Sequence, residues 1–479
     1  MRLSELAYES ISPDPHIEGL TADSRAVSRG FLFAALSGVN TDGAKYIPQA
    51  EQSGAVAILA KPGATSNLPI IVDAEPRRRL AQMAARYYPR QPEIIAGVTG
   101  TNGKTSTARF AAHLWALLGV HSGSIGTLGA ESANFTRPLV HTTPDPVTLH
   151  ETIDSMVRAG VTHLAMEVSS HGITQHRADA VHFRIAAFTN ITQDHLDYHA
   201  SFEEYFAVKG RLFTDLLANN GIAVINMDGE GAENIVSLAR ERGVATIQTG
   251  AKGRDLRLLG CTPHLGGLTL EVETHGKAYR VDTPLIGSFQ AENVLLAAGI
   301  VIAGGERAND VVQMLGGIVG APGRMQFVCE ASGGGVFVDY AHSPDAVATA
   351  LQAIRPHSTG RVIAIVGAGG DRDKTKRPLM GAAAKQHADI VIVTDDNPRT
   401  EDPAAIRAAV LKGCPGAKEI GERAEAITAG VAQLRKGDVL LIMGKGHEAG
   451  QQVGDQLLPF DDASVALEVV ADQFKELGR

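Results

Sequence analysis

Short apolar runs that end in polar or glycine-rich turns recur along this chain and alternate with segments of helical periodicity. Residues 94–98 form one such run, and between Thr105 and Gly119 apolar side chains return every three or four positions. Alternation of this kind predicts a mainly parallel β-sheet covered by helices. Further apolar runs that predict strands lie at 163–168, 185–188 and 222–226.

Two proline-containing segments divide the pattern. Pro89 and Pro92 disfavour helix continuation after a helical segment at 77–88, which follows predicted strands at 30–35 and 55–59. A Pro-Gly turn within 321–328 precedes a fresh series of buried strands, and a strand-rich stretch at 256–281 predicts a small antiparallel addition. The sequence therefore predicts an α/β fold in three domains, at 1–93, 94–325 and 326–479.

Composition agrees with three globular domains and excludes several functions. Of the 479 residues, 44% are hydrophobic and 20% are charged, a composition typical of globular proteins. The chain is too long for a single hydrophobic core. A net charge of −9 argues against broad nucleic-acid binding. The scattered Cys261, Cys329 and Cys414 predict free thiols in a reducing compartment. With no apolar run of membrane-spanning length, we expect a cytoplasmic protein that binds a small molecule.

The segment GVTGTNGKTS, residues 97–106, is the most informative motif. It places a glycine-rich turn between a predicted strand and the first turn of a predicted helix, where free N–H groups and the helix dipole favour phosphate. Lys104 is expected to reach the β- and γ-phosphates, and the Thr105 hydroxyl to bind Mg²⁺. Val98 stands where the standard phosphate loop has its first glycine, so an ordinary glycine turn is the alternative. The predicted phosphate-binding residues are Gly100, Thr101, Asn102, Gly103, Lys104, Thr105 and Ser106.

Acidic and histidine residues follow the next predicted strands. Glu167 and His195 offer ligands that suit Mg²⁺ beside a nucleotide, together with Thr105. A zinc site or a solvated loop is the alternative for the segment around His195. Lys209 lies in a predicted helix, and its spacing alone indicates only a solvated or phosphate-pairing side chain.

In the last third of the chain, three buried strands end in the loops GAGGDRD, DDNPR and GKGHE. Because ligands collect at the carboxyl ends of parallel strands, we expect these loops to share one site. Arg372 stands where a dinucleotide motif needs its third glycine, which disfavours a nicotinamide cofactor. DDNPR combines carboxylates, an amide and a guanidinium, a set suited to a zwitterion, although a charged surface turn is the alternative.

Taken together, GVTGTNGKTS, HTTPD, MEVSSHGITQHR, NITQDHLDYH, VKGRLF, APGRM, VDYAHSP, GDRDKTKRP, DNPR and GKGHE closely resemble the bacterial Mur ligases over essentially the whole chain. LTADSR and SGVNTDG match the family's uridine-nucleotide segments. The resemblance implies a central P-loop-type domain with a mainly parallel sheet. It also implies an N-terminal UDP-binding α/β domain and a C-terminal Rossmann-like α/β domain that holds the amino acid.

The resemblance also implies roles for single residues. Lys209 matches the family's carbamylated lysine, a carbamate that bridges to Mg²⁺, so Lys104, Lys209, Glu167 and His195 form the implied catalytic set. Arg377 competes with Arg372 for the amino-acid carboxylate. Implied nucleotide contacts, besides the loop, are Asn293, Arg324 and Asp339. Implied contacts to the UDP substrate are Ala22, Ser24, Val39, Asn40, Thr41, Thr142, Thr143, Ser169, Gln175 and Arg177. Implied contacts to the amino acid are Arg372, Asp396, Asn397, Pro398, Arg399, Gly444 and Glu448.

DNPR distinguishes diaminopimelate addition from lysine addition in this family. The resemblance therefore implies an ATP-dependent ligase that adds meso-diaminopimelate to the D-glutamate of UDP-N-acetylmuramoyl-L-alanyl-D-glutamate through an acyl phosphate. ATP is the co-substrate, Mg²⁺ the cofactor and the chain a monomer, in a pathway that supports peptidoglycan synthesis, cell shape and cell division. The alternatives are the same scaffold acting on L-lysine or another amino acid, and a P-loop nucleotide switch.

Overall fold

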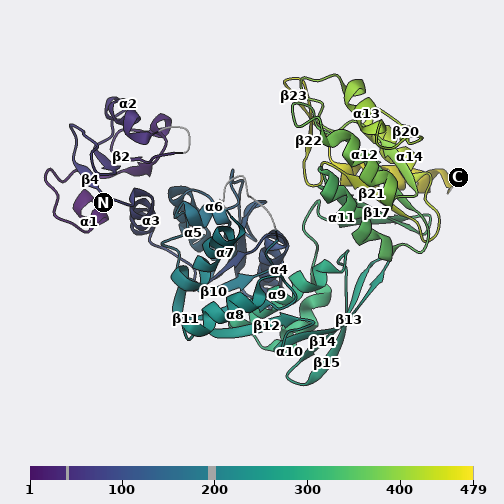
Figure 1. The fold of residues 1–479 in the computed structure, drawn as a ribbon, viewed down its shortest axis with the longest axis horizontal. Coiled ribbons are helices and arrows are strands. Elements are labelled where there is room, and N and C mark those ends of the chain that lie inside the picture. The colour runs from purple at the N-terminus through teal and green to yellow at the C-terminus, as the bar shows by residue number, and fades with distance from the viewer. Residues whose placement is uncertain (39–41, 193–200, 478–479) are drawn as a thin grey trace. The chain divides into compact units, whose positions relative to one another are not determined.

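The computed structural model describes residues 1–38, 42–192 and 201–477, which fold into two compact units. The first unit comprises Met1–Asp255 with Leu296–Arg307, and the second comprises Leu256–Leu295 with Ala308–Arg479. Figure 1 labels the elements as they are named below. Among the described residues, no helix has the length and apolar character needed to cross a membrane.

A four-stranded parallel sheet in the order β1-β2-β3-β4 opens the first unit. Its helix α3 begins at a proline, where the missing N–H costs no intrahelical bond, and it ends before Pro89 as the sequence predicted. Leu32, Leu59 and Leu80 are fully buried in the core that joins this helix to the sheet. The elements are α1 (Leu3–Ala7), β1 (Gly19–Thr21), β2 (Phe31–Ala35), α2 (Ile47–Gln52), β3 (Ala57–Ala60), β4 (Ile70–Val72) and α3 (Pro76–Tyr87).

The larger sheet of this unit is mainly parallel, as predicted, in the strand order β12-β11-β10-β5-β9-β6-β7-β8. Within this order, β7 runs antiparallel to β6, and β8 runs antiparallel to β7. Its strands are β5 (Ile94–Thr99), β6 (Ser122–Gly126), β7 (Gly129–Ser132), β8 (Phe135–Arg137), β9 (His163–Glu167), β10 (Phe183–Phe188), β11 (Leu217–Asn226) and β12 (Ala245–Gly250). The helices that accompany it are α4 (Lys104–Leu117), α5 (Pro146–Arg158), α6 (Ser170–Thr174), α7 (Phe202–Arg211) and α8 (Ala232–Glu241).

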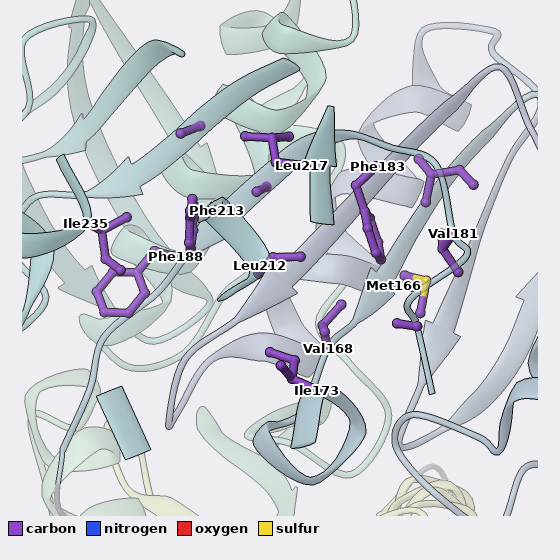
Figure 2. Close-up of a cluster of buried hydrophobic side chains, with 14 of the residues drawn as sticks. Met166, Val168, Ile173, Val181, Phe183, Phe188, Leu212, Phe213, Leu217 and Ile235 are labelled. Atoms are coloured by element: carbon purple, nitrogen blue, oxygen red, sulfur yellow. The ribbon is translucent and has the colours of Figure 1, made fainter. Parts of the chain in front are cut away.

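A buried apolar cluster on one face of this sheet fixes the strand ends that carry polar loops. Figure 2 shows Phe183, Phe188 and Phe213 among its members, and the rings of Phe188 and Phe213 meet edge to face with centroids 6.5 Å apart. Met166 belongs to the same cluster and directly precedes Glu167. The core therefore holds the end of β9, and with it the position of Glu167.

The second unit contains a six-stranded sheet in the order β16-β17-β21-β18-β19-β20, parallel except for β16. It also contains the antiparallel meander that the sequence predicted at 256–281. The strands are β13 (Leu256–His264), β14 (Gly267–Thr274), β15 (Lys277–Thr283), β16 (Gln326–Ala331), β17 (Gly334–Asp339), β18 (Val362–Val366), β19 (Ile390–Val393), β20 (Lys418–Glu419), β21 (Val439–Met443), β22 (Gly450–Val453) and β23 (Gln456–Pro459). The helices are α10 (Ala308–Met314), α11 (Pro344–Ile354), α12 (Lys376–His387), α13 (Pro403–Leu411), α14 (Arg423–Val431) and α15 (Asp462–Leu477), and α9 (Phe289–Ala303) is divided between the two units.

Candidate functional site

The loop between β5 and α4 has the backbone of a phosphate cradle. Gly100 has a φ of +143°, and a Cβ atom there would lie 1.8 Å from the Thr189 hydroxyl oxygen, so only glycine fits. The Thr101 N–H donates to the Asn190 carbonyl at 2.8 Å and ties the loop to the end of β10. Gly103 caps α4, so the loop ends at a helix N-terminus as the sequence predicted.

Lys104 folds back over this loop. Its Nζ atom donates to the carbonyl oxygens of Gly100 at 3.0 Å and Thr101 at 2.7 Å. The half-buried ammonium group therefore lies beside the loop amides and adds positive charge to the cradle.

Lys209 is not a solvated side chain, because only 1% of it is exposed. It lies near the end of α7, a helix whose N-terminus is capped by the Ser201 hydroxyl. Its Nζ atom donates to the Gly100 carbonyl at 2.8 Å and lies 4.5 Å from the centre of the Tyr205 ring. The Tyr205 hydroxyl in turn contacts the Thr101 hydroxyl at 3.2 Å. The structure thus brings Lys209 into the phosphate loop, which its sequence spacing did not reveal.

Glu167 lies at the end of β9 and is 2% exposed. Its Oε2 atom accepts a hydrogen bond from the Thr105 hydroxyl at 2.9 Å, and its Oε1 atom accepts one from the Thr127 N–H at 2.7 Å. Burial raises the pKa of Glu167, while the Thr127 N–H, the charge of Lys104 and the Thr105 hydroxyl oppose the rise. A buried carboxylate beside a hydroxyl is a hard-oxygen donor pair, so these residues fit Mg²⁺.

Polar side chains before α5 and after β9 form a second cluster next to Glu167. The Thr143 hydroxyl donates to the Glu167 carbonyl at 3.0 Å and contacts the Ser169 hydroxyl at 3.2 Å. Arg177 donates to the Thr143 carbonyl at 2.7 Å and to the Gln175 side-chain oxygen at 2.9 Å. The Thr142 hydroxyl contacts that of Thr127 at 3.0 Å. The predicted substrate residues Thr142, Thr143, Ser169, Gln175 and Arg177 are therefore gathered at one place.

Two further predicted substrate residues, Ala22 and Ser24, follow β1. Ala22 is exposed after β1, and the Ser24 hydroxyl donates to Gln49 at 3.3 Å. The predicted residues outside the described part of the chain are Val39, Asn40, Thr41 and His195.

Of the predicted nucleotide residues of the second unit, Asp339 ends β17 and Asn293 lies in α9, and both are buried. Asp339, 8% exposed, accepts the N–H groups of Met325 at 2.8 Å and Ala341 at 2.8 Å. Burial raises the pKa of Asp339, and those two N–H groups oppose the rise. The Arg324 guanidinium lies 4.8 Å from the centre of the Tyr340 ring. Asn293, in α9, donates to Gln290 at 2.9 Å.

The loops after β18, β19 and β21 meet, as the sequence predicted. Arg399 donates to the Gly370 carbonyl at 2.7 Å, and its backbone adopts the left-handed region with a φ of +52°. The Asn397 amide donates to the Glu448 carboxylate at 2.8 Å. A guanidinium and a carboxylate are thus held on one loop system, an arrangement that suits a ligand carrying both a carboxylate and an ammonium group.

Asp396 and Gly444 lie in close contact within this loop system. Asp396 is 6% exposed, and a Cβ atom on Gly444 would lie 2.2 Å from its carboxylate oxygen, so glycine permits the close approach. Burial raises the pKa of Asp396, while the charges of Arg423 and Lys445 oppose the rise. Pro398, buried between Asn397 and Arg399, accepts the Glu401 N–H at 3.1 Å.

The two competing arginines have different surroundings. Arg377 is 3% exposed and donates to both carboxylate oxygens of Glu401, at 2.8 and 3.0 Å. Arg372 is exposed. Because Arg377 already has a carboxylate partner, the geometry favours Arg372 as the arginine available to a ligand.

Two residues of these sites did not emerge from the sequence analysis. Thr127 supplies an N–H to Glu167, and Lys445 lies buried beneath Asn397. A backbone donor leaves no signal in residue type, so Thr127 could not have been found. Lys445 stands between two glycines in GKGHE, directly after a buried strand. That position was the sequence signal that could have indicated a buried lysine. Within the described residues, no group of three or more His, Cys, Asp or Glu side chains forms a metal cluster.

Three family models match the chain in succession. They are described as Mur ligase family, catalytic domain (residues 16–90), Mur ligase middle domain (98–301) and Mur ligase, glutamate ligase domain (323–446).

Individual relatives match along nearly the whole chain. The UDP-N-acetylmuramoyl-L-alanyl-D-glutamate–2,6-diaminopimelate ligase of Caulobacter vibrioides is 47% identical, with 98% of each chain covered. The enzyme of the same name from Bradyrhizobium diazoefficiens is 46% identical over 99% of this chain and 100% of its own. A solved structure of a ligase of that name superposes with a TM-score of 0.77 at 31% identity and covers 99% of each chain.

Proposed function

Since the chain belongs to the Mur ligase family, we propose that it joins meso-diaminopimelate to the D-glutamyl carboxylate of UDP-N-acetylmuramoyl-L-alanyl-D-glutamate, with ATP as co-substrate. The diaminopimelate ligases to which it is similar are matched from end to end. The observation that carries the choice of amino acid is the pairing of Asn397 with Glu448 next to Arg399. The Glu448 carboxylate can accept hydrogen bonds from an ammonium group, and the Arg399 guanidinium can donate to a carboxylate. Diaminopimelate has a second carboxylate, which lysine lacks.

The phosphate loop binds the nucleotide in this proposal. Its N–H groups and the Lys104 ammonium stabilise negative charge that moves from the γ-phosphate to the leaving ADP while the substrate carboxylate forms an acyl phosphate. Gly100 keeps the loop backbone close to the end of β10, so these donors are in place before the reaction begins. The proposed further contacts to the nucleotide are Asn293, Arg324 and Asp339.

Lys209 is proposed to react with CO₂ as a neutral amine, which forms a carbamate and releases a proton. The buried Lys209 Nζ atom shares the Gly100 carbonyl with the Lys104 ammonium group, so an anionic carbamate would lie close to a cation. Conversion to a carbamate replaces a buried cation with an anion beside the phosphate loop.

Glu167, Thr105, the Lys209 carbamate and His195 are the proposed magnesium ligands. Mg²⁺ held there would neutralise charge on the phosphate oxygens. The chain's own part is to keep the Glu167 carboxylate oriented through the Thr105 hydroxyl and the Thr127 N–H.

The cluster around Thr143 and Arg177 is proposed to hold the muramoyl dipeptide, while Ala22, Ser24 and the 39–41 segment hold the UDP group. This assignment is supported by the hydrogen bond from Thr143 to the backbone of Glu167, which couples the dipeptide residues to the proposed metal ligand. The amine of diaminopimelate then displaces phosphate from the acyl phosphate.

We propose that the chain works as a cytoplasmic monomer with domains at 1–93, 94–325 and 326–479. The three family-model matches support this division. Residues 256–295 group with the C-terminal residues in the structure because Leu265 and Ile286 pack against the core of that unit.

The proposal is tested by incubating the protein with the UDP-dipeptide, ATP and Mg²⁺ together with meso-diaminopimelate, L-lysine or no amino acid. Mass spectrometry of the UDP product and release of phosphate are the measurements. We expect a UDP-tripeptide with diaminopimelate and little product with lysine. A preference for lysine would refute the assignment of the 396–399 loop, and nucleotide hydrolysis without any UDP-tripeptide would favour a nucleotide switch.

A further inference from the structure

A buried lysine lies just after β21 of the C-terminal sheet. Lys445 is 0% exposed, and its Nζ atom donates to the Asn397 side-chain oxygen at 3.1 Å and to the Glu448 carboxylate at 3.4 Å. Its third hydrogen bond goes to the Gly450 carbonyl. An ammonium group has three donors, and all three are therefore used.

Burial of a lysine is costly, so its position needs a reason. Lys445 follows β21, between two glycines whose missing side chains let the backbone lie against Asp396 and Tyr340. Its side chain consequently lies beneath the 396–399 loop rather than in solvent. An apolar residue at this position would leave the Asn397 side-chain oxygen and the Glu448 carboxylate without this donor.

The hydrogen bonds of Lys445 fix the orientation of Asn397. The Asn397 Oδ1 atom accepts from Lys445 Nζ at 3.1 Å and from the Gln452 N–H at 2.9 Å, which occupies both of its lone pairs. The Nδ2 atom must therefore point the other way, and it donates to Glu448 Oε2 at 2.8 Å. A flipped amide would place its NH₂ group against two donors.

The same lysine also fixes Glu448. Glu448 Oε2 accepts from both Asn397 Nδ2 and Lys445 Nζ, whereas its side chain as a whole remains 34% exposed. Both of these hydrogen bonds reach the same carboxylate oxygen, and part of the side chain stays accessible. Gln451 and Gln452 of the β22–β23 hairpin complete the arrangement, because the Gln451 side chain donates to the Asp396 carbonyl at 2.6 Å.

We infer that Lys445 is a positioning residue for the amino-acid substrate, one that acts directly and through the Asn397 amide to hold the Glu448 carboxylate toward the ligand's ammonium group. This inference rests on the proposed function. It extends the set of residues that determine amino-acid selection to a side chain that does not touch the ligand.

Lys445→Met tests the inference, since methionine has a similar length and no charge. We expect the KM for diaminopimelate to rise about 10-fold or more, as removal of a supporting partner typically causes. The KM values for ATP and the UDP-dipeptide should stay within about twofold of wild type, because those sites have their own partners. Arg361→Gln is the matched control, since it breaks an ion pair with the buried Asp438 at the start of β18 and β21, the opposite end of the sheet. It should lower thermal stability without a selective change in the diaminopimelate KM.

Gln452→Pro provides a second, independent variant. It removes the other donor to Asn397 Oδ1 and leaves Lys445 in place, so it should also raise the KM for diaminopimelate selectively. If Lys445→Met does not fold, the KM values of Gln452→Pro test the inference instead. An unchanged diaminopimelate KM, or an equal rise in all three KM values, overturns the inference. A wild-type protein that makes no tripeptide from diaminopimelate refutes the proposed function instead.

Discussion

Lys104 and Lys209 donate hydrogen bonds to the same atom, the carbonyl oxygen of Gly100, at 3.0 and 2.8 Å. They come from different helices, α4 and α7, and Lys209 is almost completely buried. Two ammonium groups on one oxygen repel each other, and burial adds to the cost of the second charge. Replacement of the Lys209 cation by a carbamate would turn this repulsion into attraction.

Lys209→Met should therefore remove most of the turnover. We expect kcat to fall by about 10²- to 10³-fold, the usual effect of losing one group that stabilises transition-state charge. The affinity for the UDP-dipeptide should change little, because its proposed residues lie in the Thr143 cluster. Steady-state kinetics and calorimetric binding measure the two effects, and ¹³C NMR after equilibration with labelled bicarbonate should show a carbamate signal that Lys209→Met lacks.

Lys385→Met is the control for that substitution, because Lys385 is an exposed lysine near the end of helix α12. It should behave as wild type in both assays. Normal turnover in Lys209→Met would contradict the carbamate role.

The sequence predicted the glycine-rich loop between a strand and a helix because its signal is local. Strand, glycines, Lys104 and Thr105 are contiguous, and the structure has them at the junction of β5 and α4. It also predicted that the loops after β18, β19 and β21 meet, since topology brings the ends of parallel strands together. The burial of Lys209 could not be predicted, because its neighbour Gly100 is 109 residues away in the chain. The choice between Arg372 and Arg377 stayed open for the same reason, since it depends on the distant Glu401.

Glu167→Gln should weaken the dependence of the reaction on Mg²⁺. We expect the half-saturating Mg²⁺ concentration to rise about 10-fold or more, because an amide oxygen lacks the charge of a ligating carboxylate. Activity titrated with MgCl₂ after chelation measures the shift. Glu151→Gln is the control, since that half-exposed carboxylate on α5 pairs only with Arg137 among the partners described for it. Equal shifts in the two variants would show that Glu167 is not a ligand.

Arg399→Ala should raise the KM for diaminopimelate by about 10- to 100-fold, as expected for the loss of charge-assisted hydrogen bonds to a carboxylate. The KM for ATP should stay near its wild-type value. Arg399→Lys keeps the charge but loses the planar fork, so it should recover only part of the affinity. If the KM values for ATP and diaminopimelate rose equally, Arg399 would be maintaining the fold of the loop through its bond to Gly370.

Substitutions of Arg372 and Arg377 should separate binding from folding. Arg372→Ala removes an exposed side chain, so we expect a higher diaminopimelate KM with an unchanged melting temperature. Arg377→Ala breaks the ion pair with Glu401 and should lower the melting temperature by several degrees. Thermal unfolding and kinetics on both variants distinguish the roles, and the reverse outcome would assign the carboxylate to Arg377.

The Arg377–Glu401 pair should also make the stability of this region depend on pH. Hydrogen bonds from Arg377 lower the pKa of Glu401 from 4.5 to about 2 in the folded protein, so the folded state binds this proton more weakly than the unfolded chain. The stabilisation is therefore complete above pH 4.5 and is lost as the pH falls toward 2. Glu401→Gln lacks it at every pH, so the two proteins should differ most at neutral pH and converge in acid. Hydrogen exchange of the α12 amides, compared at each pH between wild type and Glu401→Gln, measures the difference, with Asp455→Asn in the exposed β22–β23 turn as the control. A difference that stays constant from pH 7 to pH 2.5 would mean that Glu401 stabilises the loop without its charge.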